Sequence, residues 1–547
     1  MEWPYQFLHL DEAGRQERRA ILDRYGLYGQ LSAFIPITLV LIFRLTRKIL
    51  NKTLGKNPSY DAVPTSPSTK PPKRTIAFSL TQKLRRWLWW LENDIEIAGQ
   101  RWSRVDQLIF GGMWTAWLMF LCLNQTRNDY FLLTRKFGAL GASQLPIQYL
   151  LSLKRLNPVA IAFRTSHENI NRWHRVLGWI SYFFIFLHGS FYINYYIQVG
   201  GLGAAFFRTV PVLGMLGLLG MTCLSATTIK VVRQYSYRVF FITHLAVALV
   251  LPISIWFHVP HGRLFMAQAF LVLIADMVAR KFYTVACPAT VDMVPGTDLI
   301  KVMTEVPPAR LRRFAAHPGS HAYLSVPQAT FLPSGVLSNP FTVVSANEET
   351  GYLTFVARRM HGLATQTLAR FAGVHWPNTK LTLNLDGPYG AATYFPDLAA
   401  GFDKVLLVAG GVGATFITPL YEHIITENPA ARVQLVWAVR NTDELVWSRV
   451  AKDDNRIRVF VTGEQADSDS AGSSTGLPGE FGDVELDILE KDRQQNATVP
   501  PEIRRRPDLQ EIVDEFLGYG VHEHCAVVVC GPELMTSDLR NAIGIWI

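Results

Sequence analysis

Two histidine pairs with the same spacing constrain this chain more than any other feature. His174 and His188 are separated by thirteen residues, and so are His244 and His258. Fourteen steps along an α-helix are roughly 21 Å and roughly 1400°, which is about 40° short of four turns. Each pair therefore lies on nearly one helix face, with one histidine near each side of a membrane. Two such helices packed together would offer two facing couples, the ligand set of two bis-histidine haems.

These histidines lie in an apolar half of the chain. Hydrophobic residues make up 49% of the sequence and charged residues 18%, but residues 27–283 are much denser in Leu, Phe, Trp and Tyr than the remainder. A single histidine in an apolar helix is most often a hydrogen-bonded packing residue, whereas repeated ionisable groups in lipid are costly and functional. We therefore interpret all four histidines as metal ligands to haem iron.

Seven stretches are candidate membrane spans by length and hydrophobicity. The basic residues cluster beside them, so the net charge of +9 fits the positive-inside rule and not nucleic-acid binding. The same rule places the soluble C-terminal half in the cytosol, His174 and His244 in an inner couple, and His188 and His258 in an outer couple. The seven spans are 27–43, 107–123, 137–153, 173–195, 206–226, 237–259 and 264–282.

Several other residues near the spans have two interpretations. His261 is either an alternative outer ligand, a weak metal contact at the exit, or a solvated loop residue. Arg172 and Arg175 flank His174 and are either partners of haem propionates or interfacial anchors. The five cysteines form no CxxC pair and are odd in number, so neither a zinc site nor a disulfide framework is indicated. Residues 1–26 are expected to form an extracytosolic tail without a cleavable signal peptide.

The pattern changes to short β-rich runs from Cys287 onward. The runs 299–304, 322–326 and 353–357 predict a small antiparallel barrel. Arg358 then precedes an expected helix start that contains Gly362 and Thr365. An arginine beside a helix N-terminus is a ready anion site and suits a flavin pyrophosphate.

A nucleotide-binding α/β domain is predicted after the barrel. The apolar strand 405–409 leads into a glycine-rich turn and a helix, the arrangement that cradles phosphates. A second strand, 433–439, ends in Arg440, which is a candidate contact for an adenosine phosphate. A Ser-, Gly- and acid-rich insertion is expected to be a disordered loop without function. The turn comprises Gly410, Gly411, Gly413 and Thr415, and a third strand, 526–529, ends in Cys530, Gly531 and Pro532.

Over roughly residues 138–531 the chain resembles the fungal ferric reductases, or metalloreductases, of the ferric reductase and NADPH oxidase superfamily. The His-x13-His spacing matches in both pairs, whereas NADPH oxidases have one residue fewer in the second. The resemblance maps the family's His-Pro-Phe-Thr flavin motif onto residues 339–342. It maps the family's pyridine-nucleotide motifs onto residues 387–390, 410–415 and 530–532. The cofactor residues that it implies are His321, Tyr323, Asn339, Pro340, Phe341 and Thr342 for FAD, with Gly387, Pro388, Tyr389 and Gly390 for the nucleotide.

The resemblance implies a chain of several domains. We expect a multi-pass α-helical membrane bundle of about seven helices with two b-type haems, then a cytosolic β-barrel FAD domain and an α/β NADPH domain like that of ferredoxin reductases. Asn339 departs from the family's histidine, and Trp546 is the candidate for the aromatic residue that covers the flavin. The expected segments are 1–26 (tail), 27–136 (two helices with a basic loop), 137–283 (haem-binding), 287–395 (FAD) and 400–547 (NADPH), with the insertion at 463–501.

The expected activity is that of a ferric-chelate reductase. NADPH would supply electrons through FAD and the haems to Fe(III) chelates, siderophores or Cu(II) outside the cell, before uptake by permease or oxidase partners. We expect the plasma membrane as the location, with the vacuolar membrane as the alternative. The rival functions are an NADPH oxidase that makes superoxide and a non-catalytic haem-binding membrane subunit, the latter suggested by Asn339.

Overall fold

The chain forms two compact units, Met1–Ala279 and Arg280–Ile547, and each is described by itself. The computed structural model describes residues 4–53, 76–97, 100–326, 338–360, 362–372, 381–448, 454–463, 503–518 and 523–547. Most of the predicted insertion at 463–501 lies outside these residues.

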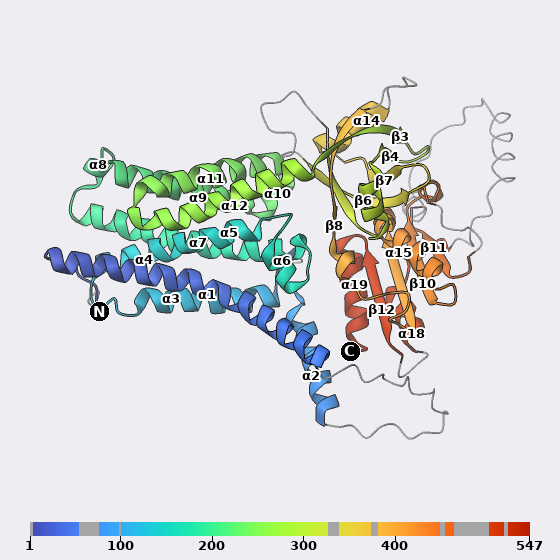
Figure 1. The fold of residues 1–547 in the computed structure, drawn as a ribbon, viewed down its shortest axis with the longest axis horizontal. Coiled ribbons are helices and arrows are strands. Elements are labelled where there is room, and N and C mark those ends of the chain that lie inside the picture. Colours follow the sequence, from blue (N-terminus) through green and yellow to red (C-terminus); the bar gives the residue numbers. More distant parts are fainter. Residues whose placement is uncertain are drawn as a thin grey trace, which may run out of the picture. The chain divides into compact units, whose positions relative to one another are not determined.

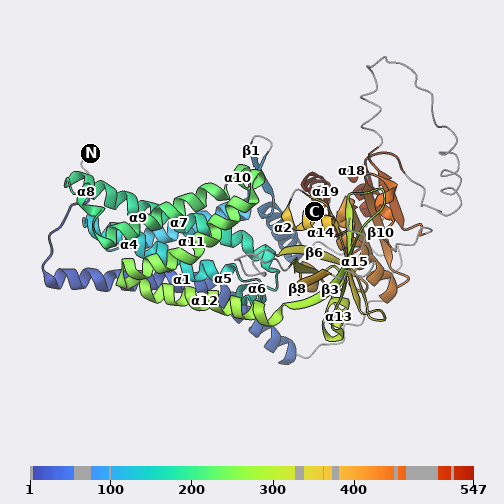
Figure 2. The same cartoon turned by 90° about the horizontal axis from the view of Figure 1, so that it is seen from above.

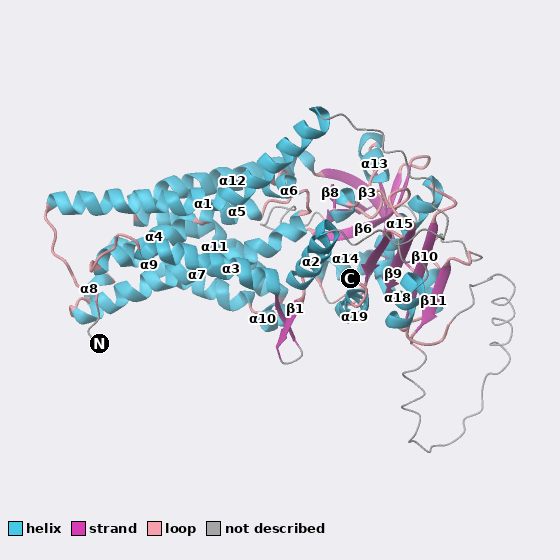
Figure 3. Cartoon of the chain, turned by 90° about the horizontal axis from the view of Figure 1, so that it is seen from below, coloured by secondary structure: helices cyan, strands magenta, loops and turns pink. Residues whose placement is uncertain are grey.

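The first unit is a helical bundle (Figure 1). A short hairpin, β1 and β2, lies at the end of the bundle near α2 and α10 (Figures 2 and 3). The elements of the bundle and its hairpin are α1 (Glu12–Thr53), α2 (Ile76–Leu91), β1 (Asp94–Ile97), β2 (Gln100–Arg104), α3 (Val105–Leu123), α4 (Tyr130–Ser143), α5 (Leu145–Leu151), α6 (Pro158–Phe163), α7 (His167–Gln198), α8 (Leu202–Ala205), α9 (Thr209–Thr228), α10 (Lys230–Tyr235), α11 (Tyr237–His258), η1 (Pro260–Gly262) and α12 (Arg263–Tyr283).

Among the described residues, six helices are long and apolar enough to cross a membrane: α1, α3, α7, α9, α11 and α12. The prediction of a seventh single span at 137–153 is wrong, because this stretch is divided between α4 and α5. Pro146 has no N–H to donate to the carbonyl of Ala142, so the helix is interrupted at Gln144. The two short helices follow one another along the bundle (Figures 1 and 2).

The break is stabilised by the side chain of Gln144. Its amide oxygen accepts from the indole of Trp114 on α3 at 3.2 Å, and its amide nitrogen donates to the carbonyl of Gly29 on α1 at 3.2 Å. Polar groups buried in a bundle need such partners. The interruption is therefore also the point at which three segments of the bundle are joined.

Helix α1 is longer than the sequence predicted. It begins at Glu12, within the segment expected to be a tail, and the carboxylate of Asp11 accepts from the backbone N–H of Gly14 before its first turn. Arg18 on this helix pairs with Asp129, whose side chain also caps α4, with the nearest atoms 2.7 Å apart. Both groups are buried, so this ion pair ties the start of α1 to the start of α4.

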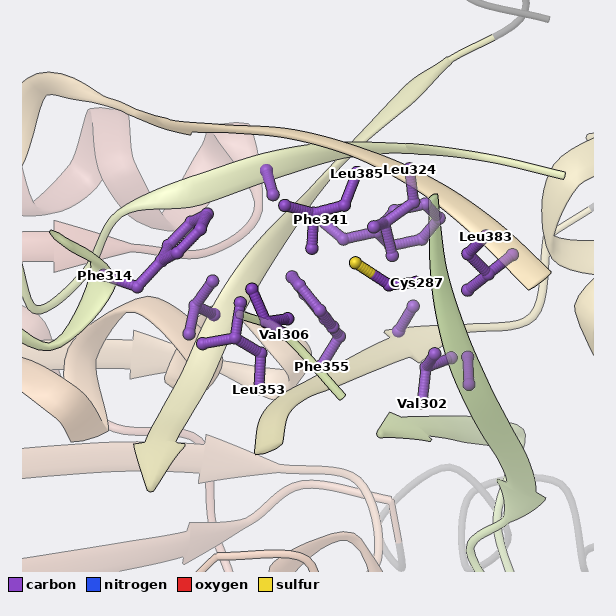
Figure 4. Close-up of a cluster of buried hydrophobic side chains, with 14 of the residues drawn as sticks. Cys287, Val302, Val306, Phe314, Leu324, Phe341, Leu353, Phe355, Leu383 and Leu385 are labelled. Atoms are coloured by element: carbon purple, nitrogen blue, oxygen red, sulfur yellow. The ribbon is translucent and has the colours of Figure 1, made fainter. Parts of the chain in front are cut away.

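The second unit opens with a closed antiparallel barrel, as predicted. Its strands are hydrogen-bonded in the order β3-β4-β7-β6-β5-β8, and alternate side chains such as Val302, Phe355 and Leu383 fill its interior (Figure 4). The elements are β3 (Val285–Met293), β4 (Leu299–Glu305), α13 (Pro308–Ala315), β5 (His321–Ser325), β6 (Asn339–Asn347), β7 (Tyr352–Arg358), α14 (Leu363–Ala372), β8 (Leu381–Tyr389) and η2 (Ala391–Tyr394).

A parallel sheet follows in the order β11-β10-β9-β12, with helices on its faces. Strands β9, β10 and β12 are the continuous apolar runs that the sequence predicted, because both faces of a parallel sheet are covered, whereas the edge strand β11 was not predicted. The predicted α/β fold is therefore confirmed. The elements are β9 (Lys404–Gly410), η3 (Gly411–Gly413), α15 (Ala414–Glu427), β10 (Arg432–Val439), η4 (Thr442–Leu445), β11 (Ile457–Val461), α18 (Leu509–Gly518), β12 (Cys525–Cys530) and α19 (Glu533–Gly544).

Candidate functional site

The four membrane histidines form two facing couples between α7 and α11. The ring centroids of His174 and His244 are 6.0 Å apart, and those of His188 and His258 are 6.2 Å apart. An imidazole nitrogen binds a metal ion at about 2.0–2.1 Å, so two rings on one ion have centroids roughly 6 Å apart. Both couples therefore have the separation of a bis-imidazole metal centre, and their members are those that the spacing predicted.

Backbone carbonyls fix the protonation of three of these rings. Nδ1 of His188 lies 2.7 Å from the carbonyl oxygen of Thr134, and Nδ1 of His258 lies 2.8 Å from that of Val210. Nδ1 of His174 lies 2.9 Å from the carbonyl oxygen of Gln148. Because a carbonyl only accepts, each Nδ1 carries the proton and each Nε2 keeps its lone pair. The neutral imidazole is the metal-binding form, and it binds through the lone pair of its unprotonated nitrogen.

Two glycines make room for the outer couple. A Cβ at Gly138 on α4 would be 2.7 Å from Nδ1 of His188, and one at Gly214 on α9 would be 2.8 Å from Cε1 of His258. Each glycine follows the accepting carbonyl by four residues, one helical turn. A carbonyl and a glycine one turn later thus form a socket for each outer ring, and we call these the Thr134–Gly138 and Val210–Gly214 sockets.

The flanking arginines have different surroundings. Arg172 pairs with Asp106 of α3 at 3.2 Å and lies over the ring of Trp173, which matches the anchor interpretation. Arg175 lies within electrostatic range of Arg233 on α10. Two neighbouring cations favour an anion between them, so Arg175 remains a candidate partner of a haem propionate. His261 is held by Asp23 and is not a member of either couple.

An aromatic group lines the barrel where β5 and β8 meet. The rings of His321, Tyr323 and Tyr389 have centroids 5.4–6.0 Å apart, and the hydroxyl of Tyr389 donates to Asp386 at 2.7 Å. Gly390 lies against this group, since a Cβ there would be 3.3 Å from Nδ1 of His321. The segments that the resemblance assigned to the flavin and to the nucleotide therefore meet at one end of the barrel.

The flavin-motif residues of β6 point in different directions. Asn339 and Pro340 are exposed, and Thr342 is opposite His321 on β5. Phe341 is buried among the barrel core residues (Figure 4), so its side chain is structural. Gly387 and Pro388 lie on β8 beside β5, and a Cβ at Gly387 would be 2.9 Å from Phe314.

The expected pyrophosphate site begins at Arg358, at the end of β7. Its guanidinium is 2.6 Å from the carboxylate of Glu444 in η4, a partner that the sequence did not indicate. Helix α14 begins at Leu363, directly after Gly362, as predicted. The hydroxyl of Thr365 accepts from the N–H of Met360, so it caps the turn that leads into the helix.

The glycine-rich turn and the end of β12 are in direct backbone contact. A Cβ at Gly413 would be 2.2 Å from the carbonyl oxygen of Cys530, and one at Gly410 would be 2.6 Å from Pro532. Gly411 has φ +52°, which favours glycine, and Gly531 lies against Gly410. Burial raises the pKa of the Cys530 thiol, so it stays protonated near neutral pH.

These groups meet at the carboxyl ends of three parallel strands, where open α/β sheets bind ligands. Arg440 follows β10 and is exposed, while the hydroxyl of Thr415 is turned inward to the carbonyl of Val412 at 2.9 Å. The indole of Trp546 donates to Asp514 on α18 at 2.8 Å, so this side chain is held on the α/β domain.

Sequence reasoning missed the groups that position the histidines. The carbonyls of Thr134, Gln148 and Val210 have no sequence signature, since every residue carries one. Glu444 was missed because only the tertiary fold brings it to Arg358. Gly138 lies four residues after Thr134, in a stretch that was predicted only as a membrane span.

Three family models match consecutive parts of the chain. The ferric reductase like transmembrane component matches residues 137–255, the FAD-binding domain matches 283–393, and the ferric reductase NAD binding domain matches 402–543. A probable metalloreductase AIM14 of Meyerozyma guilliermondii is 24% identical over 481 residues, covering 87% of this chain and 90% of that protein. The ferric/cupric reductase transmembrane component 2 of Schizosaccharomyces pombe is 21% identical over 463 residues, covering 75% and 77%.

The comparisons agree with the fold in the segments that the three family models match. Six candidate spans and the transmembrane model make this a multi-pass membrane protein. The FAD-binding and NAD-binding models make it an oxidoreductase that takes electrons from NAD(P)H and carries them toward a membrane domain. In chain order, the protein therefore has a ferric reductase like transmembrane component, a FAD-binding domain and a ferric reductase NAD binding domain.

Proposed function

We propose that this protein transfers electrons from cytosolic NADPH, through FAD and two b-type haems, to Fe(III) chelates or Cu(II) on the other side of the membrane. The observation that carries the proposal is the pair of histidine couples on α7 and α11, each at the separation of a bis-imidazole metal centre. The FAD-binding and NAD-binding models in the same chain support it.

Each haem would be held by one histidine from α7 and one from α11. Bis-imidazole haem iron has no open position, so it exchanges single electrons and does not bind oxygen at the metal. His174 with His244 would hold the inner haem, and His188 with His258 the outer. The Nδ1–H bonds to the carbonyls of Thr134, Gln148 and Val210 would leave Nε2 of three ligands as the nitrogen that binds iron.

The soluble domains would supply the electrons in pairs. Flavin is the cofactor that converts a two-electron donor into one-electron steps. We assign its site to the barrel end that carries His321, Tyr323, Asn339 and Thr342, with Arg358 and α14 for its phosphates. We assign NADPH to Gly410–Gly413, Arg440 and Cys530–Pro532, because phosphates bind at a glycine-rich turn before a helix.

The relatives favour a metal as the final acceptor. One is named a metalloreductase and another a ferric/cupric reductase component. A positive-inside orientation places the basic end of α7 and α10 in the cytosol and the outer couple on the opposite side. We propose the plasma membrane as the location, with the vacuolar membrane as the alternative.

The test uses membranes from cells that express the chain, with NADPH supplied on the cytosolic side. The expected result is Fe(II)-chelate formation on the far side that superoxide dismutase does not suppress. His188→Ala should abolish it, while flavin-dependent reduction of a soluble dye on the cytosolic side continues. Dismutase-sensitive reduction would instead assign an NADPH oxidase. Haems that dithionite reduces but NADPH does not would assign a non-catalytic haem-binding subunit.

A further inference from the structure

A carboxylate–histidine pair lies at the outer end of the bundle. Nδ1 of His261, in η1, is 2.7 Å from the carboxylate of Asp23 on α1. The two residues are 238 positions apart, so the fold and not the local sequence brings them together. A carboxylate beside an imidazole holds the proton on the nearer nitrogen. In the neutral ring this leaves Nε2 as the nitrogen of His261 that can bind a metal.

The pair has the form of a metal ligand with its supporting acid. Metal-binding histidines almost always donate their other ring N–H to a carboxylate, a carbonyl or water, which fixes the ring and raises its basicity. The side chain of His261 is 30% exposed and that of Asp23 is 62% exposed, so an ion can reach both. A partly exposed pair of this kind contributes little to stability, so stability alone is a weak reason for the arrangement.

The pair is close to the outer couple. His261 follows His258 by three residues, and three residues span at most about 11 Å even when fully extended. Asp23 lies in the first part of α1, whose start is tied by Arg18 to Asp129 at the start of α4. The same helix α4 provides the Thr134–Gly138 socket for His188. Asp23, His261 and both outer ligands thus belong to one end of the bundle.

We propose that His261, oriented by Asp23, binds the metal substrate at the outer surface as a Cu(II) or Fe(III) ion with exchangeable ligands. The proposal rests on the proposed function and specifies its acceptor site. Imidazole suits copper and iron, and Cu(II) binds nitrogen sites most tightly among the divalent first-row ions. One electron converts Cu(II) to Cu(I) or Fe(III) to Fe(II). The metal–nitrogen bond is the only bond made and broken, and no proton moves.

The experiment compares two acceptors in membranes given NADPH. Cu(II) in a weakly coordinating buffer can take Nε2 of His261 as a ligand, whereas ferricyanide, whose coordination sphere is filled by cyanide, cannot. In His261→Gln, which keeps an N–H for Asp23 but has no imidazole, we expect the KM for Cu(II) to rise at least about tenfold, while kcat/KM for ferricyanide stays unchanged. Asp23→Asn should raise the KM for Cu(II) about 10–100-fold.

His9→Ala is the matched control, because His9 is an exposed histidine in the segment before α1. It should leave both acceptors unchanged. The proposal is overturned if His261→Gln leaves the KM for Cu(II) unchanged, or if it lowers the rates with both acceptors equally, which is the result expected of a merely structural pair.

A binding measurement separates this site from the electron-transfer proposal. Cu(II) added to the oxidised protein should give an EPR spectrum with nitrogen hyperfine structure, and His261→Gln should remove that signal. This readout does not depend on NADPH or on haem reduction. If NADPH fails to reduce the haems but the His261-dependent signal is present, the proposed function fails and the metal site stands. If the signal is unchanged in His261→Gln, the metal site fails.

Discussion

His188 packs directly on the backbone of Gly138, where a Cβ would stand only 2.7 Å from its Nδ1. Gly138→Ala must therefore displace the ring from the carbonyl of Thr134. We expect loss of the outer haem and retention of the inner one. Because each couple would hold one of the two haems, the reduced-haem absorbance per protein should fall to about half of the wild-type value. Gly217→Ala is the control, because its Cβ would be 3.6 Å from Leu251, an ordinary contact. Full haem content in Gly138→Ala would refute the socket.

The Val210–Gly214 socket predicts the same effect from the opposite ligand. Gly214→Ala places a methyl group 2.8 Å from the ring of His258. Its spectrum should match that of Gly138→Ala, and the double variant should lose no more haem than either single one, because both changes disable one site. An additive loss, with the inner haem also missing in the double variant, would show that these glycines support the bundle in general.

The contact between Gly413 and Cys530 predicts a selective loss in the nucleotide domain. A Cβ at Gly413 would be 2.2 Å from a carbonyl oxygen, so Gly413→Ala must separate the ends of β9 and β12. We expect NADPH-dependent haem reduction to fall about 10–100-fold or more, as for a 1 Å misplacement of a binding group. Dithionite should still reduce the haems fully. Gly518→Ala, which meets nothing within 4 Å, should behave as the wild type.

Asn339 offers a gain-of-function test of the flavin site. It is exposed at the start of β6, opposite Leu324 and next to the Pro340–Tyr323 pair. Because the resembling family has histidine here, Asn339→His should increase the FAD retained after purification, measured by flavin fluorescence per protein. Asn347→His, at the other end of the same strand, should have no effect. Equal retention in Asn339→His and the wild type would place the flavin elsewhere.

A partly exposed ionic group in the α/β domain predicts a pH dependence of stability. Two hydrogen bonds of 2.8 Å from Arg456 lower the pKa of Asp454 to about 2, and Tyr421 also donates to this carboxylate. Since the folded pKa lies below the ordinary aspartate value of 3.8, the stabilisation is complete above about pH 4 and is lost as the pH falls toward 2. Asp454→Asn should cost about 1.5–3 kcal/mol at pH 7.

The measurement is thermal unfolding of the wild type and of Asp454→Asn across this pH range. The difference between the two should be constant from pH 7 to about 4 and should shrink below it. Asp292→Asn, an exposed position on β3, serves as the control. A constant difference down to pH 2 would show that the ionised carboxylate is not the stabilising species.

Periodicity was enough to predict the main features of this chain. A helix turns by a fixed angle per residue, so the spacing of His174, His188, His244 and His258 determined which rings would face each other. Continuous apolar runs likewise identified the parallel strands. The interrupted span was mispredicted because hydrophobicity alone does not register a missing N–H at Pro146. The ion pair of Arg18 in α1 was missed because Asp129 is distant in sequence.

His244 is the exception among the four facing imidazoles, because its Nδ1 has no hydrogen-bond partner among the described residues. An N–H that donates to a carbonyl makes its ring a stronger electron donor, and His174, His188 and His258 all have this donor character. The two couples therefore differ in basicity, and weaker donation stabilises a metal less in its oxidised state. We expect the two centres to titrate at separate midpoint potentials, with the higher one at the couple that contains His244.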